Sequence, residues 1–168
     1  MTDSGSGEDE RAEKLARLHQ AFMGFVPHNK ALGLVFEGYG DGEATIRLPY
    51  DAKLIGNPDT GVLHGGALTA LLDATAGASV FLRTWEPKPI ATLDLRIDYM
   101  RPAAPGRDVT ARAVCYAMTR SVAFVRAAAF HDLESDPIAT AVGTFMLDTK
   151  GRSALASVSS RSGRGGGT

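Results

Sequence analysis

One segment near the middle of the chain constrains the fold more than any other. Residues 65–82 read GGALTALLDATAGASVFL, and Asp73 is the only charged residue among them. An apolar run of this length is typical either of a membrane-spanning helix or of a helix buried in a protein core. A carboxylate at the centre of a membrane helix costs about 2.5–3.5 kcal/mol on insertion, and this segment also opens with two glycines. The sequence therefore favours a buried core helix, predicted over residues 64–83.

Four segments after this helix alternate apolar and polar residues, which is the period of a β-strand. The clearest is 92–99, TLDLRIDY, and the others lie near 108–118, 121–131 and 137–147. Before the helix, two shorter strands are predicted near 32–38 and 43–49, and a first helix from Glu8 to Phe25 that Pro27 ends. Closely spaced strands form antiparallel sheets, and a lone apolar helix must bury its surface against one. The prediction is an α+β domain: a long central helix against an antiparallel sheet of about six strands.

Composition and charge exclude several classes of protein. The 168 residues include 18 Lys and Arg against 19 Asp and Glu, a net charge of −1, which lacks the basic surplus of nucleic-acid-binding proteins. The single Cys115 excludes an intramolecular disulfide and a multi-thiolate zinc site, and it suits a reducing compartment. The first ten residues are polar and acidic, unlike a signal peptide. We expect a cytoplasmic protein that binds neither nucleic acid nor membranes and uses no metal or cofactor.

Both ends of the chain have the composition of unstructured tails. Residues 1–8 are mostly Gly, Ser and acidic, and residues 151–168 are mostly Gly, Ser and Arg. We expect one domain over residues 9–150 between two disordered tails. The GYGDG segment at 38–42 has the glycine spacing of a dinucleotide-binding loop, but it lies between two predicted strands with no helix after it. It is therefore interpreted as a hairpin turn. A loop over residues 50–62 leads to the central helix.

Asp73 is the first candidate for chemistry. Nothing within four residues on the same helix can pair with it, and an unpaired carboxylate removed from water is costly. Its side chain is therefore exposed at a cleft, satisfied by another element, or held protonated. The first and third cases suit a general base or a nucleophile, and the second makes Asp73 a structural acid. The residues alone leave both interpretations open.

His64-Gly65-Gly66, at the predicted helix start, is the second candidate. The first N–H groups of a helix have no partner within it and suit an oxyanion, although glycines also fit a sharp turn or close packing. Gly65 and Asp73 are eight residues apart, which is about 12 Å along a helix axis. An attacking group and an oxyanion donor both lie about 3 Å from the reacting carbonyl, so one chain cannot supply both. If both serve one reaction, the protein is an oligomer with its site between subunits.

Taken together, these residues resemble the hotdog-fold acyl-CoA thioesterases of the PaaI type. The similarity rests on Asn57-Pro58, on GVLHGG at 61–66, and on Asp73 nine residues after the histidine. It continues in TLDLRIDYMRP at 92–102 and GTF at 143–145, and it spans about residues 30–148. The resemblance implies a long helix wrapped by a curved antiparallel sheet. It also implies a homodimer or homotetramer with active sites between subunits, and hydrolysis of an acyl-CoA without a cofactor.

The resemblance implies roles for individual residues. Asp73 matches the carboxylate that acts as general base or nucleophile, and the Gly65 N–H matches the oxyanion donor. His64 and Asn57 match polar groups that hold the thioester and the loop, although Asn57 lies seven residues before the histidine where some members have six. Thr92 matches a hydroxyl that positions water, and an ordinary β-former fits the same position equally well.

Substrate contacts are less constrained. Gly66 is a candidate because a glycine lets a ligand approach the backbone closely. Arg101 and Arg120 are candidates for contacts with CoA phosphates, and each also fits an ion-paired or solvated strand residue. Aromatic, short and medium acyl groups all stay open.

Two alternative functions remain. Hotdog enoyl-CoA hydratases use an Asp and a His five residues apart, as Asp59 and His64 are, although Asp59 also fits a turn. A hydratase would consume the enoyl absorbance without releasing a thiol. The other alternative is a non-catalytic acyl-CoA-binding module, which would bind acyl-CoA tightly without turnover.

Overall fold

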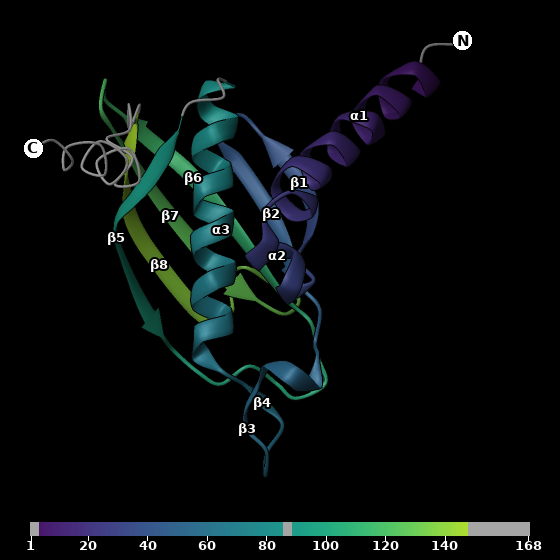
Figure 1. The fold of residues 1–168 in the computed structure, drawn as a ribbon, viewed down its shortest axis with the longest axis vertical. Coiled ribbons are helices and arrows are strands. Elements are labelled where there is room, and N and C mark those ends of the chain that lie inside the picture. The colour runs from purple at the N-terminus through teal and green to yellow at the C-terminus, as the bar shows by residue number, and fades with distance from the viewer. Residues whose placement is uncertain (1–3, 86–88, 148–168) are drawn as a thin grey trace, which may run out of the picture.

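A computed structural model describes residues 4–85 and 89–147, which form one sheet around one long helix (Figure 1). The helix is α3 (Gly65–Thr84), close to the predicted 64–83. The six strands, each antiparallel to its neighbours, are β1 (Val35–Gly40), β2 (Glu43–Leu48), β5 (Ile90–Tyr99), β6 (Val109–Met118), β7 (Val122–Phe130) and β8 (Ala139–Leu147). Their order across the sheet is β1-β2-β6-β7-β8-β5. The predicted α+β class and the six-stranded antiparallel sheet are confirmed.

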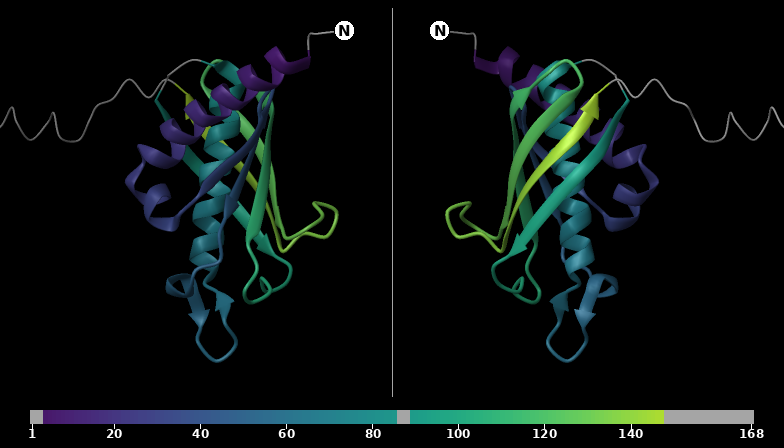
Figure 2. Two further views of the ribbon diagram at one scale, coloured as in Figure 1. Left: turned by 90° about the vertical axis from the view of Figure 1, so that its right-hand side faces the viewer. Right: turned by 90° about the vertical axis from the view of Figure 1, so that its left-hand side faces the viewer.

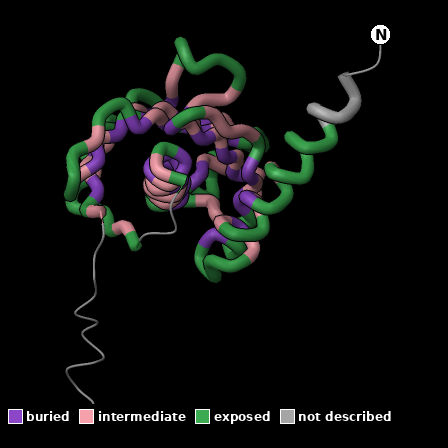
Figure 3. The backbone as a smooth tube through the Cα atoms, turned by 90° about the horizontal axis from the view of Figure 1, so that it is seen from above, coloured by how far each residue is buried: buried purple, intermediate pink, exposed green. Residues whose placement is uncertain are grey.

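The sheet curves around α3, as the view from above shows (Figure 3). Its inner face is rich in small buried residues, which lets the helix approach the strands closely. These residues are Ala44, Ala111, Ala113, Ala127, Ala129 and Ala141. The helix buries Leu71, Leu72 and Val80 against them, and two buried hydroxyls on α3 bond to helix carbonyls. Although α3 is long and apolar enough to cross a membrane, it is the core helix of this fold.

The N-terminal segment differs from the single helix predicted over 8–25. Helix α1 (Ser4–His19) continues into a π-helical turn over Gln20–Gly24, and α2 (Pro27–Leu32) follows. Pro27 therefore begins a helix as well as following one. The N–H at the first position of a helix makes no bond within the helix, so a proline there loses no hydrogen bond. The first strand consequently starts at residue 35 instead of 32. Since α1 starts at residue 4, the expected tail over 1–8 is helical from that residue, whereas the tail over 151–168 lies outside the described residues.

The predicted loop over 50–62 contains a small hairpin that projects below the sheet (Figure 2). Strands β3 (Ile55–Asn57) and β4 (Val62–Leu63) pair antiparallel after a 3₁₀ turn over Ala52–Leu54. The turn is closed by Asn57, whose carbonyl accepts the Gly61 N–H at 2.9 Å. Gly61 has a φ of +73°, a left-handed conformation that glycine adopts without strain. No strand is predicted here from the sequence because β3 and β4 are only three and two residues long.

Candidate active site

A groove runs along the face of α3 that the sheet leaves uncovered. Its volume is about 690 Å³, and it lies between the N-terminal segment on one side and β5 and β8 on the other. The α3 residues that line it recur three or four positions apart, so they form one stripe along the helix. They are Gly66, Thr69, Ala70, Asp73, Ala74, Gly77 and Ala78. The other walls are formed by Phe22, Val26, His28, Asn29, Ile90, Thr92, Leu95 and Phe145.

Asp73 lies halfway along this groove. It is half-buried, and its Oδ1 accepts a hydrogen bond from the Thr92 hydroxyl at 2.8 Å. Within the described part of the chain, this is the only hydrogen bond or ion pair that the Asp73 carboxylate makes. The carboxylate is thus satisfied in part by β5 and open to the groove in part. It is not neutralised by a cation, which a purely structural half-buried acid would be expected to have.

His64 and the two glycines form the N-terminus of α3. His64 is the N-cap residue, and its Nδ1 accepts the Gly66 N–H at 2.9 Å. Since Nδ1 accepts, the neutral ring carries its proton on the exposed Nε2. A Cβ at position 66 would lie 2.8 Å from that Nδ1, so a larger residue there would push the His64 ring out of this cap. The Gly65 N–H has no acceptor among residues 4–85 and 89–147, and it lies at the positive end of the helix dipole.

Two residues that the sequence analysis missed hold this helix start. The Tyr99 hydroxyl, from the end of β5, donates to the Gly65 carbonyl at 2.9 Å. Thr69 lies one turn into α3, and its Oγ1 is 2.7 Å from the Tyr99 hydroxyl and 3.1 Å from the same carbonyl. Thr69 could have been predicted from the sequence as a groove residue, because it lies four residues before Asp73 and therefore on the same helix face. The Tyr99 contact joins residues 34 positions apart, and no local pattern indicates it.

The predicted catalytic residues thus fall into two groups. Asp73 and Thr92 meet in mid-groove, and His64 and Gly65 lie two turns away at the helix start, about 12 Å along the axis. Asn57 belongs to neither group directly. It lies in the β3–β4 turn, where its side chain accepts the Asp59 N–H at 3.0 Å.

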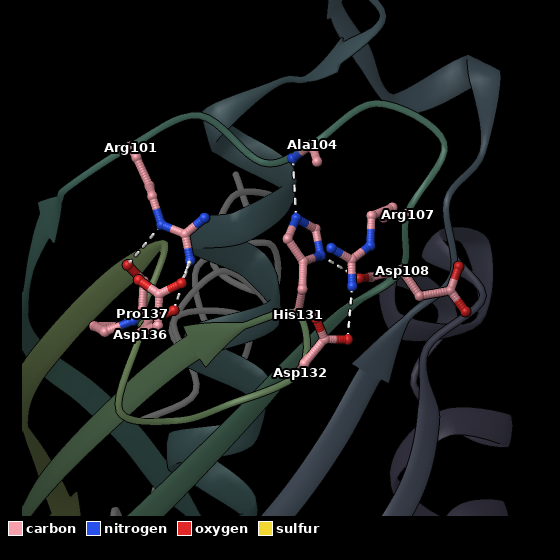
Figure 4. A network of polar contacts seen from close by, with 8 residues as sticks. All are labelled: Arg101, Ala104, Arg107, Asp108, His131, Asp132, Asp136 and Pro137. Carbon is pink, nitrogen blue, oxygen red and sulfur yellow. Dashed lines mark hydrogen bonds and ion pairs between the residues drawn. The ribbon is translucent and has the colours of Figure 1, made fainter.

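The candidates for CoA contacts lie at opposite ends of the sheet. Arg101 follows β5, and its guanidinium binds the Asp136 carboxylate at 2.6 Å and the Asp136 carbonyl at 2.7 Å (Figure 4). Arg120 is exposed in the β6–β7 turn. Since β6 spans ten residues, about 33 Å separates its two ends. The two arginines of one chain therefore lie far apart along the sheet.

Cys115 is a core residue, as predicted. Its side chain is buried on β6, and burial raises the pKa of its thiol, which keeps it protonated near neutral pH. No group of three His, Cys, Asp or Glu side chains that could hold a metal ion occurs in the part of the chain that the structure describes.

Comparisons with known proteins add an independent observation. The family model described as "Thioesterase superfamily" matches residues 60–135, which include the helix start, Asp73 and Thr92. The medium/long-chain acyl-CoA thioesterase YigI of Escherichia coli is 30% identical over 151 residues, which cover 82% of this chain and 95% of that protein.

Solved structures resemble the fold closely. A crystal structure of a Pseudomonas aeruginosa protein has 44% sequence identity and a TM-score of 0.71, and the match covers 79% of this chain and 98% of that one. A mutant of the phenylacetic acid degradation protein PaaI from Thermus thermophilus has 30% identity and a TM-score of 0.63, over 72% of this chain and 98% of that one.

Proposed function

This chain belongs to the thioesterase superfamily, as a hotdog-fold thioester hydrolase of the PaaI type, and we propose that it hydrolyses acyl-CoA with Asp73 as its catalytic carboxylate. The observation that carries the proposal is the state of Asp73. It is a half-buried carboxylate in a largely apolar groove, without a cationic partner among the described residues, and a single hydroxyl orients it. A general base or nucleophile needs this combination of a fixed geometry and an open lone pair.

The reaction has two steps. Asp73 takes a proton from a water molecule whose oxygen adds to the thioester carbonyl carbon, or its own carboxylate oxygen adds there and water later cleaves the resulting anhydride. The negative charge that develops on the carbonyl oxygen is stabilised by the free Gly65 N–H at a helix N-terminus. The C–S bond then breaks, and the CoA thiolate leaves and takes up a proton. This step gives the free acid directly when water attacks, and the Asp73 anhydride, which water then cleaves to the free acid, when the carboxylate attacks.

We propose that each site combines Asp73 and Thr92 of one subunit with the partner subunit's Gly65. Asp73 and Gly65 of one chain are too far apart to act on the same carbonyl, so a second copy must supply one of them. The edge strand β5 favours this arrangement, since among residues 4–85 and 89–147 it pairs only with β8, and residues 91–94 are exposed along it. Unpaired edge strands in soluble proteins are normally covered or protected.

The register of β5 supports the same arrangement. Thr92 contacts Asp73 near one end of β5, and Tyr99 contacts Gly65 at its other end. If two copies of β5 pair antiparallel over their whole length about a two-fold axis, residue 92 faces the partner's Ile97. That position is two residues from the partner's Tyr99. The pairing therefore brings Asp73 of one subunit toward the helix start of the other, twice per dimer.

The test is release of free thiol from a panel of aromatic, short, medium and long acyl-CoA thioesters. We expect Asp73→Asn to lower kcat at least a hundredfold, because general-base catalysis contributes about 10²–10⁴. Asp59→Asn is the matched control, since Asp59 lies exposed in the β3–β4 turn outside the groove. Turnover in Asp73→Asn close to that of the wild-type protein would refute the role of Asp73. Loss of enoyl-CoA absorbance without thiol release, abolished in Asp59→Asn, would instead favour the hydratase arrangement of Asp59 and His64.

A further inference from the structure

The face of α3 that lines the groove continues beyond the groove itself. Phe81 lies on this face, four residues after Gly77 and three after Ala78, and Trp85 follows four residues later. These two aromatic residues line a second cavity of about 580 Å³, under α1. Its apolar walls from the N-terminal segment are Leu18 and Ala21, and the charged rim includes Glu10, Glu13, Lys14 and Arg17.

One aromatic pair lies between the two cavities. Phe22 lines the groove and Phe81 lines the second cavity, and their ring centroids are 5.3 Å apart in an edge-to-face arrangement. Each ring also packs on another aromatic ring. The centroid distance is 5.9 Å from Phe22 to Phe36 and 6.1 Å from Phe81 to Trp85. Phe22 lies in the π-helical turn of the N-terminal segment, a local distortion that occurs frequently at functional sites.

The rest of the groove indicates which way an acyl chain would extend. Toward the helix start, the groove is lined by Gly66, Thr69 and His28, which are exposed and mostly polar. In the other direction, its walls are the small residues Ala74, Gly77 and Ala78 and the apolar side chains of Ile90 and Phe145. An alkyl chain is more stable in the apolar part, and the polar part is suited to the solvated CoA portion.

We propose that the Phe22–Phe81 pair is the end of the acyl-binding groove and that it sets the chain length this protein accepts. The inference rests on the proposed function, which puts the thioester carbonyl beside Asp73. Phe81 is eight residues beyond Asp73 on α3, about 12 Å along the axis. An extended alkyl chain with bonds of ~1.5 Å advances roughly 1.25 Å per carbon. The groove therefore holds acyl groups of about ten carbons, and longer chains meet the two rings.

Two substitutions shift the end of the groove in opposite directions. Phe22→Leu removes one ring of the pair and joins the groove to the second cavity, whose apolar wall can take further methylenes. Gly77→Leu adds a side chain one turn beyond Asp73, about 6 Å along the axis, and so shortens the groove. A Cβ at position 77 makes only ordinary contacts, at 3.7 Å to Ile90 and 3.9 Å to Phe145. Leucine also favours a helix over glycine, so we expect this variant to fold.

The experiment measures chain-length preference by turnover and by binding. Thiol release gives kcat/KM for acyl-CoA of 4, 6, 8, 10, 12, 14 and 16 carbons. Non-hydrolysable S-alkyl-CoA thioethers of the same lengths give Kd by calorimetry, and their binding does not depend on catalysis. Phe25→Leu is the matched control, because the Phe25 ring is 83% exposed and lines neither cavity.

Each additional methylene that is buried is worth a factor of about four in binding. We therefore expect Phe22→Leu to raise the preference for 14 over 10 carbons at least tenfold, and Gly77→Leu to lower the preference for 10 over 4 carbons at least tenfold. Phe25→Leu keeps the wild-type optimum.

The outcomes separate the two proposals. If no protein releases thiol but the thioether optimum shifts as expected, the proposed function fails and the role of the aromatic pair holds. If the wild-type protein releases thiol but all variants share one chain-length optimum, the proposed function stands and the role of the aromatic pair is refuted. An equal shift in Phe25→Leu would also refute it.

Discussion

Tyr99→Phe tests how the start of α3 is held in place. The Tyr99 hydroxyl, the Thr69 hydroxyl and the Gly65 carbonyl make three mutual contacts of 2.7–3.1 Å. Thr69 and Tyr99 each have one hydroxyl proton, so these three contacts contain at most two hydrogen bonds at a time. Tyr99→Phe therefore removes one of the two donors. A neutral hydrogen bond contributes about 1 kcal/mol net. Because Tyr99 is 51% exposed and water can replace the lost donor, about 1 kcal/mol is the upper end of the expected loss in stability.

The change is confined to the hydroxyl. The ring itself is unchanged and lies next to Gly65, where an added Cβ would be 3.6 Å from the ring carbon that bears the hydroxyl. For a chain of this size, 1 kcal/mol lowers Tm by about 3 °C. If the Gly65 N–H stabilises the oxyanion, a looser helix start also lowers kcat. A loss of about 1 kcal/mol in the transition state corresponds to roughly a fivefold fall in kcat.

The assay combines thermal unfolding with thiol release, on Tyr99→Phe, Thr69→Val and the double variant. Because both hydroxyls serve one carbonyl, we expect the effects of the two single changes on kcat to be non-additive, with a coupling of at least threefold. The reasoning is refuted if Tyr99→Phe leaves both Tm and kcat unchanged, or if the two effects are strictly additive. A fall in Tm without any change in kcat would leave Tyr99 as a purely structural residue.

Three further predictions concern other contacts in the fold. Thr92→Val should lower kcat about tenfold with little change in KM, because the Asp73 carboxylate loses the donor that orients it, and Thr92→Ser should restore most of the rate. His131→Ala should lower the free energy of unfolding by about 2 kcal/mol in urea titrations, since the ring bonds a backbone N–H at 2.9 Å and a backbone carbonyl at 2.7 Å (Figure 4). The backbone N–H of Tyr50, and secondly an arginine, hold the pKa of Asp108 below its ordinary value. The stability advantage of wild type over Asp108→Asn should therefore be full above the unfolded pKa of about 3.9 and disappear as the pH falls through the folded pKa; an equal difference at pH 3 and pH 7 would contradict this.

Much of the fold follows from local patterns. The apolar run around Asp73 predicts both ends of α3 to within one residue. The two-residue period after it predicts the ends of strands β5 to β8 to within two residues. Besides the short β3–β4 hairpin, the main failures lie in the N-terminal segment. There a π-helical turn and a second helix that begins at Pro27 interrupt a pattern that looks like one amphipathic helix. The N-terminal segment packs on α3, and this packing stabilises the break between its helices. Contacts between elements that are distant in the sequence cannot be predicted from a local pattern.

The candidate site was predicted less completely than the fold. Asp73 is a candidate from its isolation in an apolar helix, its catalytic role and Thr92 follow from the family resemblance, and in the structure the Thr92 hydroxyl lies 2.8 Å from the Asp73 carboxylate. Tyr99 was missed because its contact with Gly65 depends on how β5 passes the helix start. Asn57 was assigned to a group that holds the thioester and the loop; its observed contacts lie within the hairpin turn, and its contact with the thioester stays a prediction. The oligomeric state, the CoA contacts of Arg101 and Arg120 and a cytoplasmic location stay predictions.

The most direct test of the shared site mixes two inactive variants. Asp73→Asn removes the carboxylate, and Gly65→Pro removes the N–H that we assign to the oxyanion. Proline fits position 65 because it is the first residue of α3 and His64 before it is extended, with a ψ of 134°. Each variant alone should be inactive.

The two variants are co-refolded in equal amounts, and thiol release is measured on the mixture. A mixed dimer contains one site with both wild-type groups if the site spans two subunits. Half of the dimers are mixed, so the account predicts recovery of about a quarter of wild-type activity. A mixture that stays inactive, although mixed dimers have formed, would contradict a site built from Asp73 of one subunit and the partner subunit's Gly65.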